Sequence, residues 1–146
     1  FFNFNKQSED NAVNIFDISG RAMASQLVRL NTVASNLANA GTVTKTKEEA
    51  FRSLKPVFST KFSDSLKASG ISTVDVVGIE RVTRDPERAF MPDHPSADEN
   101  GYVYRAAVDE DEEMIEMVEA SRQYQNNVEV VSTLRHLMMR TIRMGK

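Results

Sequence analysis

The sequence contains no cysteine and no tryptophan, and only two of its 146 residues are histidines. The absence of cysteine excludes a disulfide framework and a thiolate-bound metal site. No apolar run approaches the roughly 18 residues that a membrane-spanning helix needs. A formal net charge of −3 is too small to indicate a nucleic-acid-binding protein. We therefore expect no membrane span and no nucleic-acid partner.

Motifs that carry catalysis or metal binding are also missing. His94 stands in a proline-rich turn and His136 in a helical segment, and neither has a second ligand at the spacing of a metal motif. The acidic block 109–113 lacks the alternating oxygen ligands and central glycine of a calcium loop. There is no phosphate-binding loop and no nucleophile elbow. We predict no enzyme, no cofactor and no metal.

The N-terminal third has the spacing of a coiled-coil helix. Its apolar or small positions follow one another at alternating steps of four and three residues: Phe16, Gly20, Met23, Leu27, Leu30, Ala34 and Leu37. Asp17 or Ser19 is a candidate N-cap, and Gly41 stands where a left-handed residue ends many helices. The pattern predicts a helix from about 16 to 40, within a segment 14–41 that follows an N-terminal extension, 1–13.

The C-terminal segment, 109–146, has the signals of a second long helix. Acidic residues 109–113 open it and arginines close it, which suits the helix dipole. An apolar stripe with an average step of about 3.6 runs between them: Met117, Ala120, Tyr124, Val128, Val131, Leu134, Met138 and Ile142. Five methionines (114, 117, 138, 139 and 144) favour core packing over the alternative of a promiscuous binding groove.

The middle segment, 42–108, contains all four prolines and has no helical rhythm. Residues 54–59 and 71–83 are rich in β-branched side chains and predict strands, and Asn100-Gly101 predicts a turn before a further short strand. The fold class is therefore mainly α with a small β module. Long N- and C-terminal helices pair as a coiled coil, with short strands or a hairpin between them.

Three asparagines interrupt the first helix, at positions 31, 36 and 39. Asparagine is a mediocre helix former because its amide competes for backbone groups. In a crowded array of helices, such amides can bond to neighbouring chains and fix their register. The alternative is a helix that merely tolerates asparagine.

Two segments together resemble the axial proteins of the bacterial flagellum, whose terminal helices pack into a helical tube. They are NIFDISGRAMASQLVRLNTVASNLANAGT, in which SNLANA is the most typical part, and MVEASRQYQNNVEVVSTLRHLMMRTIRMGK. The stretch MPDHPSADENGYV, Met91–Val103, resembles the turn of a proximal-rod member. The resemblance covers about 14–41 and 71–146.

The resemblance implies a structural subunit of the proximal rod that transmits motor torque. It implies export without a cleavable signal peptide, through the flagellar type III apparatus, and contacts with copies of itself, proximal and distal rod proteins and a rod-base adaptor. Phe1, Phe2 and Phe4 are expected to dock on adjacent subunits. The alternatives are a neighbouring proximal-rod protein and a soluble helical binding module. The expected assembly residues are Leu27, Leu30, Asn31, Asn36, Leu37, Asn39, Tyr124, Asn127, Val131, Leu134 and Met138.

Overall fold

The structure is a computed structural model that describes residues 2–61 and 73–145, with the backbone alone for residues 2–13, 61 and 73. The expected docking of Phe1, Phe2 and Phe4 therefore lies outside the described side chains. Two long helices, α1 (Phe2–Asn39) and α3 (Glu110–Met144), enclose the strands in sequence. The strands are β1 (Val43–Thr44), β2 (Leu54–Lys61), β3 (Thr73–Arg81), β4 (Arg88–Phe90) and β5 (Tyr102–Arg105).

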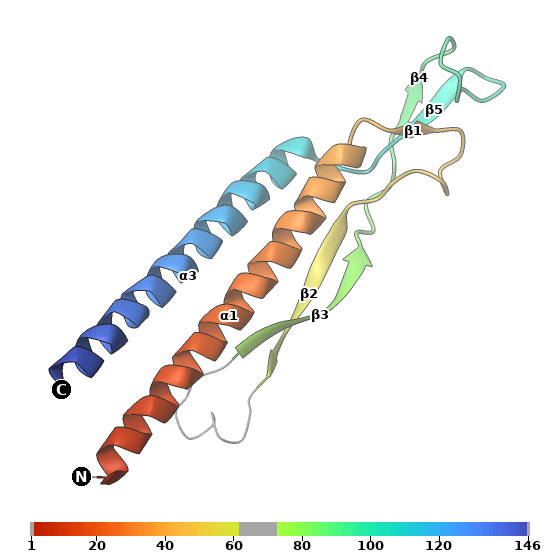
Figure 1. The fold of residues 1–146 in the computed structure, drawn as a ribbon. Coiled ribbons are helices and arrows are strands. Elements are labelled where there is room, and N and C mark those ends of the chain that lie inside the picture. Colours follow the sequence, from red (N-terminus) through yellow and green to blue (C-terminus); the bar gives the residue numbers. More distant parts are fainter. Residues whose placement is uncertain (1, 62–72, 146) are drawn as a thin grey trace.

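Helix α1 is the middle layer of an elongated molecule (Figure 1). It contacts α3 on one side and the β2–β3 hairpin on the other. The two helices run antiparallel, so the chain termini lie at one end of the molecule and the sheet of β1, β5 and β4 lies at the other. The expected mainly α fold with a small β module is confirmed.

The start of α3 is capped by Asp109. Asp109 has an extended backbone, and its carboxylate accepts the backbone N–H of Glu112 at 3.1 Å. This bond satisfies one of the amides that a helix start leaves without an intrahelical partner. The four following acids occupy the first turn, at the positive end of the dipole.

The expected start and caps of α1 need correction, whereas its end at Asn39 agrees with the expected boundary near residue 40. The helix begins at Phe2 rather than near residue 16, so neither Asp17 nor Ser19 is an N-cap. Asp17 instead pairs with Arg21 one turn later, at 3.1 Å. Gly41 is not left-handed, since Gly101 is the glycine with positive φ in the described chain. The final turn closes through Thr42, whose hydroxyl and N–H both donate to the Asn39 carbonyl, at 2.7 and 3.1 Å.

Strands β2 and β3 form the predicted hairpin arm, with antiparallel register from Leu54↔Arg81 to Lys61↔Thr73. The register shifts at Val57/Phe58, because Val57 faces Gly78 while Phe58 faces Val76. One extra residue on β3 at this point makes a β-bulge, which bends a strand and increases its twist. The bend lies where the arm runs along α1 (Figure 1).

The predicted turn before β5 is confirmed. Asp98 accepts the backbone N–H groups of Asn100 and Tyr102 at 2.9 and 2.8 Å, and the bond from Tyr102 lowers the pKa of the Asp98 carboxyl. Gly101 adopts φ 79°, a value that side-chain-bearing residues rarely take. The short partners of β5, which are β1 and β4, were missed because two or three residues carry no detectable period.

The apolar seam predicted on α1 is not the face that the chain buries. Gly20, Leu27 and Ala34 are exposed. Among the described side chains of α1, those of residues 14–39, the buried ones are mostly polar, namely Ser19, Ser25, Thr32, Val33 and Asn36. This face meets the hairpin, where the Ser25 hydroxyl donates to the Val74 carbonyl at 3.1 Å. The predicted seam is covered only in part within the chain, since Phe16, Met23, Leu30 and Leu37 are half-buried. The pattern did not reveal the polar face because it counted apolar side chains.

The stripe predicted on α3 is closer to the observed arrangement. Its first part is buried or half-buried, with Ala120 fully buried and Met117, Tyr124, Val131 and Leu134 half-buried. Val128 is exposed and Asn127 takes the half-buried place beside it. Beyond Leu134 the side chains are exposed, so the chain's own packing uses α3 up to that point.

Replacing Gly101 with alanine tests the turn. A Cβ at this position would lie 3.0 Å from the Phe90 ring and 3.1 Å from Pro92 Cβ, and a non-glycine residue at positive φ costs about 1–3 kcal/mol. We expect Gly101→Ala to lower the free energy of unfolding by about that amount in urea titrations.

Gly41→Ala is the matched control for this turn. Gly41 has open space around its Cα and no positive φ, so this variant should unfold like the native chain. Equal stability of the two variants would contradict the strained turn.

Candidate functional site

The expected assembly residues occupy three kinds of environment. Leu27 and Asn31 on α1 and Met138 on α3 are exposed. Asn36 is buried, with 1% of its surface exposed. The others are half-buried: Leu30, Leu37, Asn39, Tyr124, Asn127, Val131 and Leu134.

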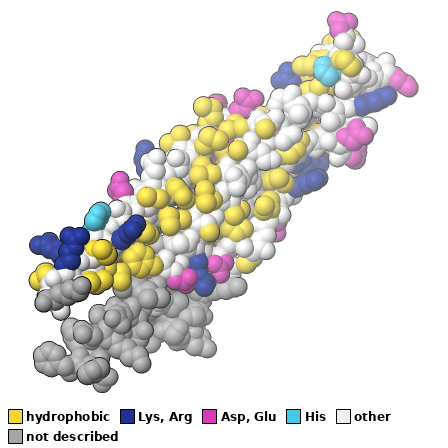
Figure 2. All heavy atoms as spheres, in the orientation of Figure 1, with side chains coloured by type: hydrophobic (Ala, Val, Ile, Leu, Met, Phe, Trp, Pro, Cys, Tyr) yellow, Lys and Arg dark blue, Asp and Glu magenta, His cyan; other side chains and the backbone are white. Residues whose placement is uncertain are grey.

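Large apolar side chains remain exposed along both helices of the single chain. On α1 they include Ile15 and Leu27, and on α3 they are Met114, Ile115, Val118, Val128, Val130, Leu137, Met138, Met139, Ile142 and Met144. Figure 2 shows apolar side chains spread along much of the visible face. Extended apolar surface on a folded chain is typical of an interaction site.

The methionines are mostly part of this surface rather than of the core. Met114, Met138, Met139 and Met144 are exposed, whereas Met117 is half-buried. The expectation of core packing was therefore wrong for four of the five. Methionine is a flexible and polarisable side chain that adapts to varied partner surfaces.

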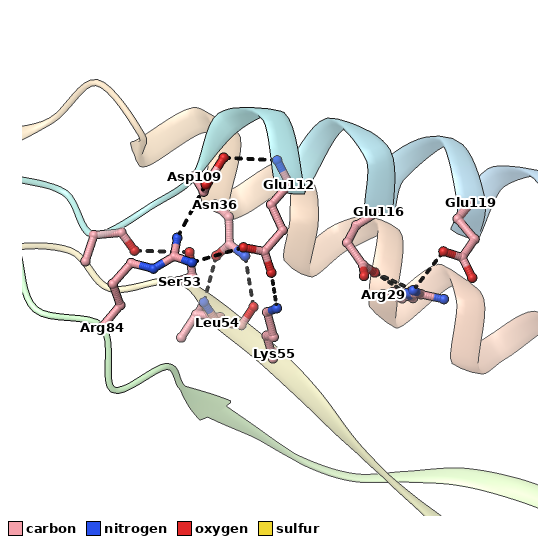
Figure 3. A network of polar contacts seen from close by, with 11 residues as sticks. Arg29, Asn36, Ser53, Leu54, Lys55, Arg84, Asp109, Glu112, Glu116 and Glu119 are labelled. Carbon is pink, nitrogen blue, oxygen red and sulfur yellow. Dashed lines mark hydrogen bonds and ion pairs between the residues drawn. The ribbon is translucent and has the colours of Figure 1, made fainter.

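Asn36 joins α1 to the start of the hairpin (Figure 3). Its amide nitrogen donates to the Leu54 carbonyl at 2.9 Å, and its amide oxygen accepts the Leu54 N–H at 2.8 Å. The side chain thus pairs with β2 in the way a neighbouring strand does. The prediction that Asn36 bonds to another chain is untested, but here the amide already serves its own chain.

The segment before Leu54 is a junction of several elements. The Ser53 backbone N–H and hydroxyl both donate to the Ala107 carbonyl, at 3.3 and 3.2 Å, and the Ser53 carbonyl accepts from Val82 at 2.8 Å. Ala107 lies three residues before α3, and Val82 directly follows β3. Asn36 therefore connects α1 to the junction where the start of β2, the end of β3 and the segment before α3 meet.

Arg29 links the two helices. Its Nε donates to the Glu116 carboxylate of α3 at 2.7 Å, and its Nη2 lies 3.7 Å from Glu119 (Figure 3). The Arg29 side chain is only 20% exposed, so this charge-assisted pair is screened less than a fully exposed one. The sequence analysis missed Arg29 because an ion pair between distant residues leaves no periodic signal.

A second ionic cluster joins the hairpin and its following loop to the start of α3. Lys55 donates to Glu112 at 2.6 Å, and Arg84 contacts Glu112 at 3.2 Å and Asp109 at 3.9 Å. The Lys55 hydrogen bond lowers the pKa of the Glu112 carboxyl below its ordinary value of 4.5. The same bond raises the pKa of the Lys55 ammonium above 10.5.

The two histidines and the acidic side chains of the described residues were examined as possible catalytic or metal-binding groups. The His94 ring accepts the Ser96 N–H at 3.0 Å, which confirms a role in its turn, and His136 is exposed on α3. Among the described residues, no group of three His, Asp or Glu side chains is placed to hold a metal ion. In the same residues, no helix has the length and hydropathy to cross a bilayer.

A slender helix pair with apolar side chains exposed along its length defines a structural subunit that packs with others. A family model described as "Flagella basal body rod protein" matches residues 16–43, and one described as "Flagellar basal body rod FlgEFG protein C-terminal" matches residues 99–144. Both match the helical ends of the chain.

Curated relatives span nearly the whole sequence. Flagellar basal-body rod protein FlgC of Salmonella typhimurium is 38% identical over 135 residues, which cover 92% of this chain and 98% of the relative. FlgC of Aquifex aeolicus is 35% identical over 133 residues, covering 91% and 96%. The chain belongs to the FlgC family of flagellar basal-body rod proteins. This family consists of structural proteins, so the chain is not an enzyme.

Replacing Asn36 with alanine tests the tie between α1 and the hairpin. The Leu54 N–H and carbonyl would lose the partner that the buried Asn36 amide supplies, at about 1–3 kcal/mol for each group left unsatisfied. We expect a loss of roughly 2–4 kcal/mol in the free energy of unfolding, together with faster hydrogen exchange at the Leu54 amide.

Asn31→Ala is the control for Asn36. Asn31 is exposed on the same helix, and alanine has the better helix propensity, so stability should stay equal or rise slightly. An Asn36→Ala chain as stable as this control, with Leu54 still protected, would contradict the tie.

The Lys55–Glu112 pair has a defined pH range. Because the folded pKa of Glu112 is lowered, its contribution is present above about pH 4.5 and is lost as the pH falls through the folded value. Since both side chains are 40–48% exposed, Glu112→Gln should cost less than about 1 kcal/mol at pH 7. Urea titrations should show the difference shrinking at about pH 3. A pH-independent difference would exclude the ion pair as its cause.

Proposed function

We propose that the chain is a structural subunit of the flagellar proximal rod that polymerises through its terminal helices into a drive shaft. The observation that carries the proposal is the exposed apolar surface of α1 and α3 in a member of the FlgC family. A chain that leaves Leu27, Val118 and Leu137 more than 40% exposed gains stability when neighbours cover them.

In this proposal α1 and α3 form a coiled-coil pair that builds the inner tube, with the β module outside. The buried and half-buried residues of α3 support the pairing, since Met117, Ala120, Tyr124, Asn127, Val131 and Leu134 follow steps of three and four. The hairpin lies on the side of α1 opposite to α3 (Figure 1). It is therefore placed to set the spacing between subunits and to carry torque from one to the next.

The proposed partners are copies of the chain, other proximal-rod and distal-rod proteins and a rod-base adaptor. The expected assembly residues that support these contacts best are the exposed ones, Leu27, Asn31 and Met138. The proposal includes export through the flagellar type III apparatus, without a cleavable signal peptide and largely unfolded.

Leu27→Asp tests assembly. Because Leu27 is 45% exposed in the single chain, a charge there leaves the monomer fold intact, whereas burying it between subunits is strongly unfavourable. In a flagellated bacterium lacking its own FlgC, we expect this variant to be exported but to give no complete rods by electron microscopy and at least tenfold less swimming.

Thr46→Asp is the control, since it adds the same charge on an exposed loop of the β module. Normal rods with both variants would contradict the helical interface.

Hydrogen exchange on the purified chain tests the alternative of a soluble helical binding module. Strong protection of both helices in a lasting monomer would indicate a self-sufficient binding module, whereas protection that appears only on association supports the polymer.

A further inference from the structure

Glu113 is a buried acid for which the chain supplies no partner. It lies in the first turn of α3, and only 3% of its surface is exposed. Among the described residues its carboxylate takes part in no hydrogen bond and no ion pair, whereas its neighbours Glu112 and Glu116 are both paired. A charge held away from water is costly unless a partner compensates it. Glu113 is therefore able to gain from a cation that comes from outside the chain.

Glu113 lines a cleft between α1, β2 and α3. Figure 3 shows these three elements side by side, with Arg29 and Lys55 reaching across to α3. The cleft has a volume of about 290 Å³ and an apolar wall that includes Val33 and Phe58. Pockets for cofactors and drug-sized ligands usually have roughly 300–1,000 Å³, so this cleft suits a single long side chain or a small ligand.

The donor side chains in the lining of the cleft are already engaged. Arg29 and Lys55 donate to other acids of α3, at 2.7 and 2.6 Å, and the Thr32 hydroxyl donates to the Val28 carbonyl at 2.8 Å. The pKa of Lys55 is raised most by its hydrogen bond and least by the charge of Glu113 across space. None of these three side chains is therefore free to neutralise Glu113.

The charge around the cleft favours a cation. The ion pairs beside it join three bases to four acids: Arg29, Lys55 and Arg84 to Asp109, Glu112, Glu116 and Glu119. With Glu113 the acids number five. A cleft with an excess of one sign of charge raises the local concentration of ions of the opposite sign.

We propose that this cleft binds a guanidinium group on an apolar stem, as carried by an arginine side chain of another rod subunit. The guanidinium pairs with the Glu113 carboxylate, and the stem packs against Val33 and Phe58. Arginine suits the site better than lysine, because its planar group pairs bidentately with a carboxylate and is more weakly hydrated. Only the source of the arginine rests on the proposed function, since the site itself can be tested on the isolated chain.

Butylguanidinium and butylurea are matched probes of the site, because they have the same shape and differ in charge. In an NMR titration of the full chain, butylguanidinium should shift the amide signals of Leu54, Phe58 and Glu113. It should bind roughly tenfold more tightly than butylurea, because hydrogen bonds between charged groups are the stronger kind. Equal binding of the two probes would overturn the carboxylate site.

Glu113→Gln separates a binding role from a structural one. Glutamine keeps the shape and removes the charge, so butylguanidinium should bind roughly tenfold more weakly. The free energy of unfolding should stay equal or rise, because an uncompensated buried charge is removed. A clear loss of stability would show that Glu113 holds the fold together and would overturn the proposal. Glu110→Gln is the control, since it removes the same charge from an exposed position in the same turn and should bind the probe like the native chain.

Crosslinking identifies the source of the guanidinium. A photoreactive benzoylphenylalanine in place of Phe58, which is 41% exposed in the lining of the cleft, is introduced in a flagellated bacterium lacking its own FlgC. We expect a crosslink to an arginine-containing segment of a rod subunit, and Glu113→Gln should weaken it. A crosslink that Glu113→Gln leaves unchanged, or one to a segment without arginine, would overturn the subunit as the source. The same group in place of Val77, which is exposed on β3 outside this lining, is the control.

The outcomes separate this inference from the proposed function. A chain that forms rods but does not prefer butylguanidinium to butylurea overturns the inference alone. A chain that binds butylguanidinium through Glu113 but gives no rods in cells overturns the proposed function and leaves the site in place.

Discussion

The two hydrogen bonds between the Asn36 amide and the Leu54 backbone determine where the β module lies. They fix the first residue of β2 against α1, and Ser53 beside it binds the backbone just before α3 and just after β3. The hairpin, both helices and the connection between them therefore share one junction. Because the amide is buried, breaking these bonds leaves polar groups without water to replace them.

The junction explains why α1 has two faces of different character. Toward the hairpin it presents Ser25, Thr32 and Asn36, which make directional contacts with a fixed register. On another side Leu27 remains exposed, and apolar contact there is non-directional. The polar face holds the subunit's own shape, and the proposed contacts with neighbouring subunits use the apolar face. Ion pairs of Arg29 and Lys55 then secure α3 along the same length.

The sequence was sufficient for the helices, the hairpin and the turn at Gly101, because each has a local signal: period, β-branched residues or a residue suited to positive φ. It misplaced the buried face of α1, since Asn36 and Ser25 act through backbone partners far along the chain. Arg29 and Glu116 are 87 residues apart, and no spacing rule connects them. The asparagines were rightly singled out, and the contact found for Asn36 lies within the chain.

The polar character of the α1–hairpin interface has a calorimetric consequence. Unfolding raises the heat capacity through newly exposed apolar surface and lowers it through newly exposed polar surface. A subunit that buries Ser19, Ser25, Thr32, Asn36 and Ser53 therefore has a smaller heat-capacity increment, and a flatter stability curve, than one with an apolar interface of the same area. In the proposed rod the larger increment belongs to association, because it would cover the apolar helix faces. The stability of the polymer should then change with temperature far more than the stability of the folded subunit.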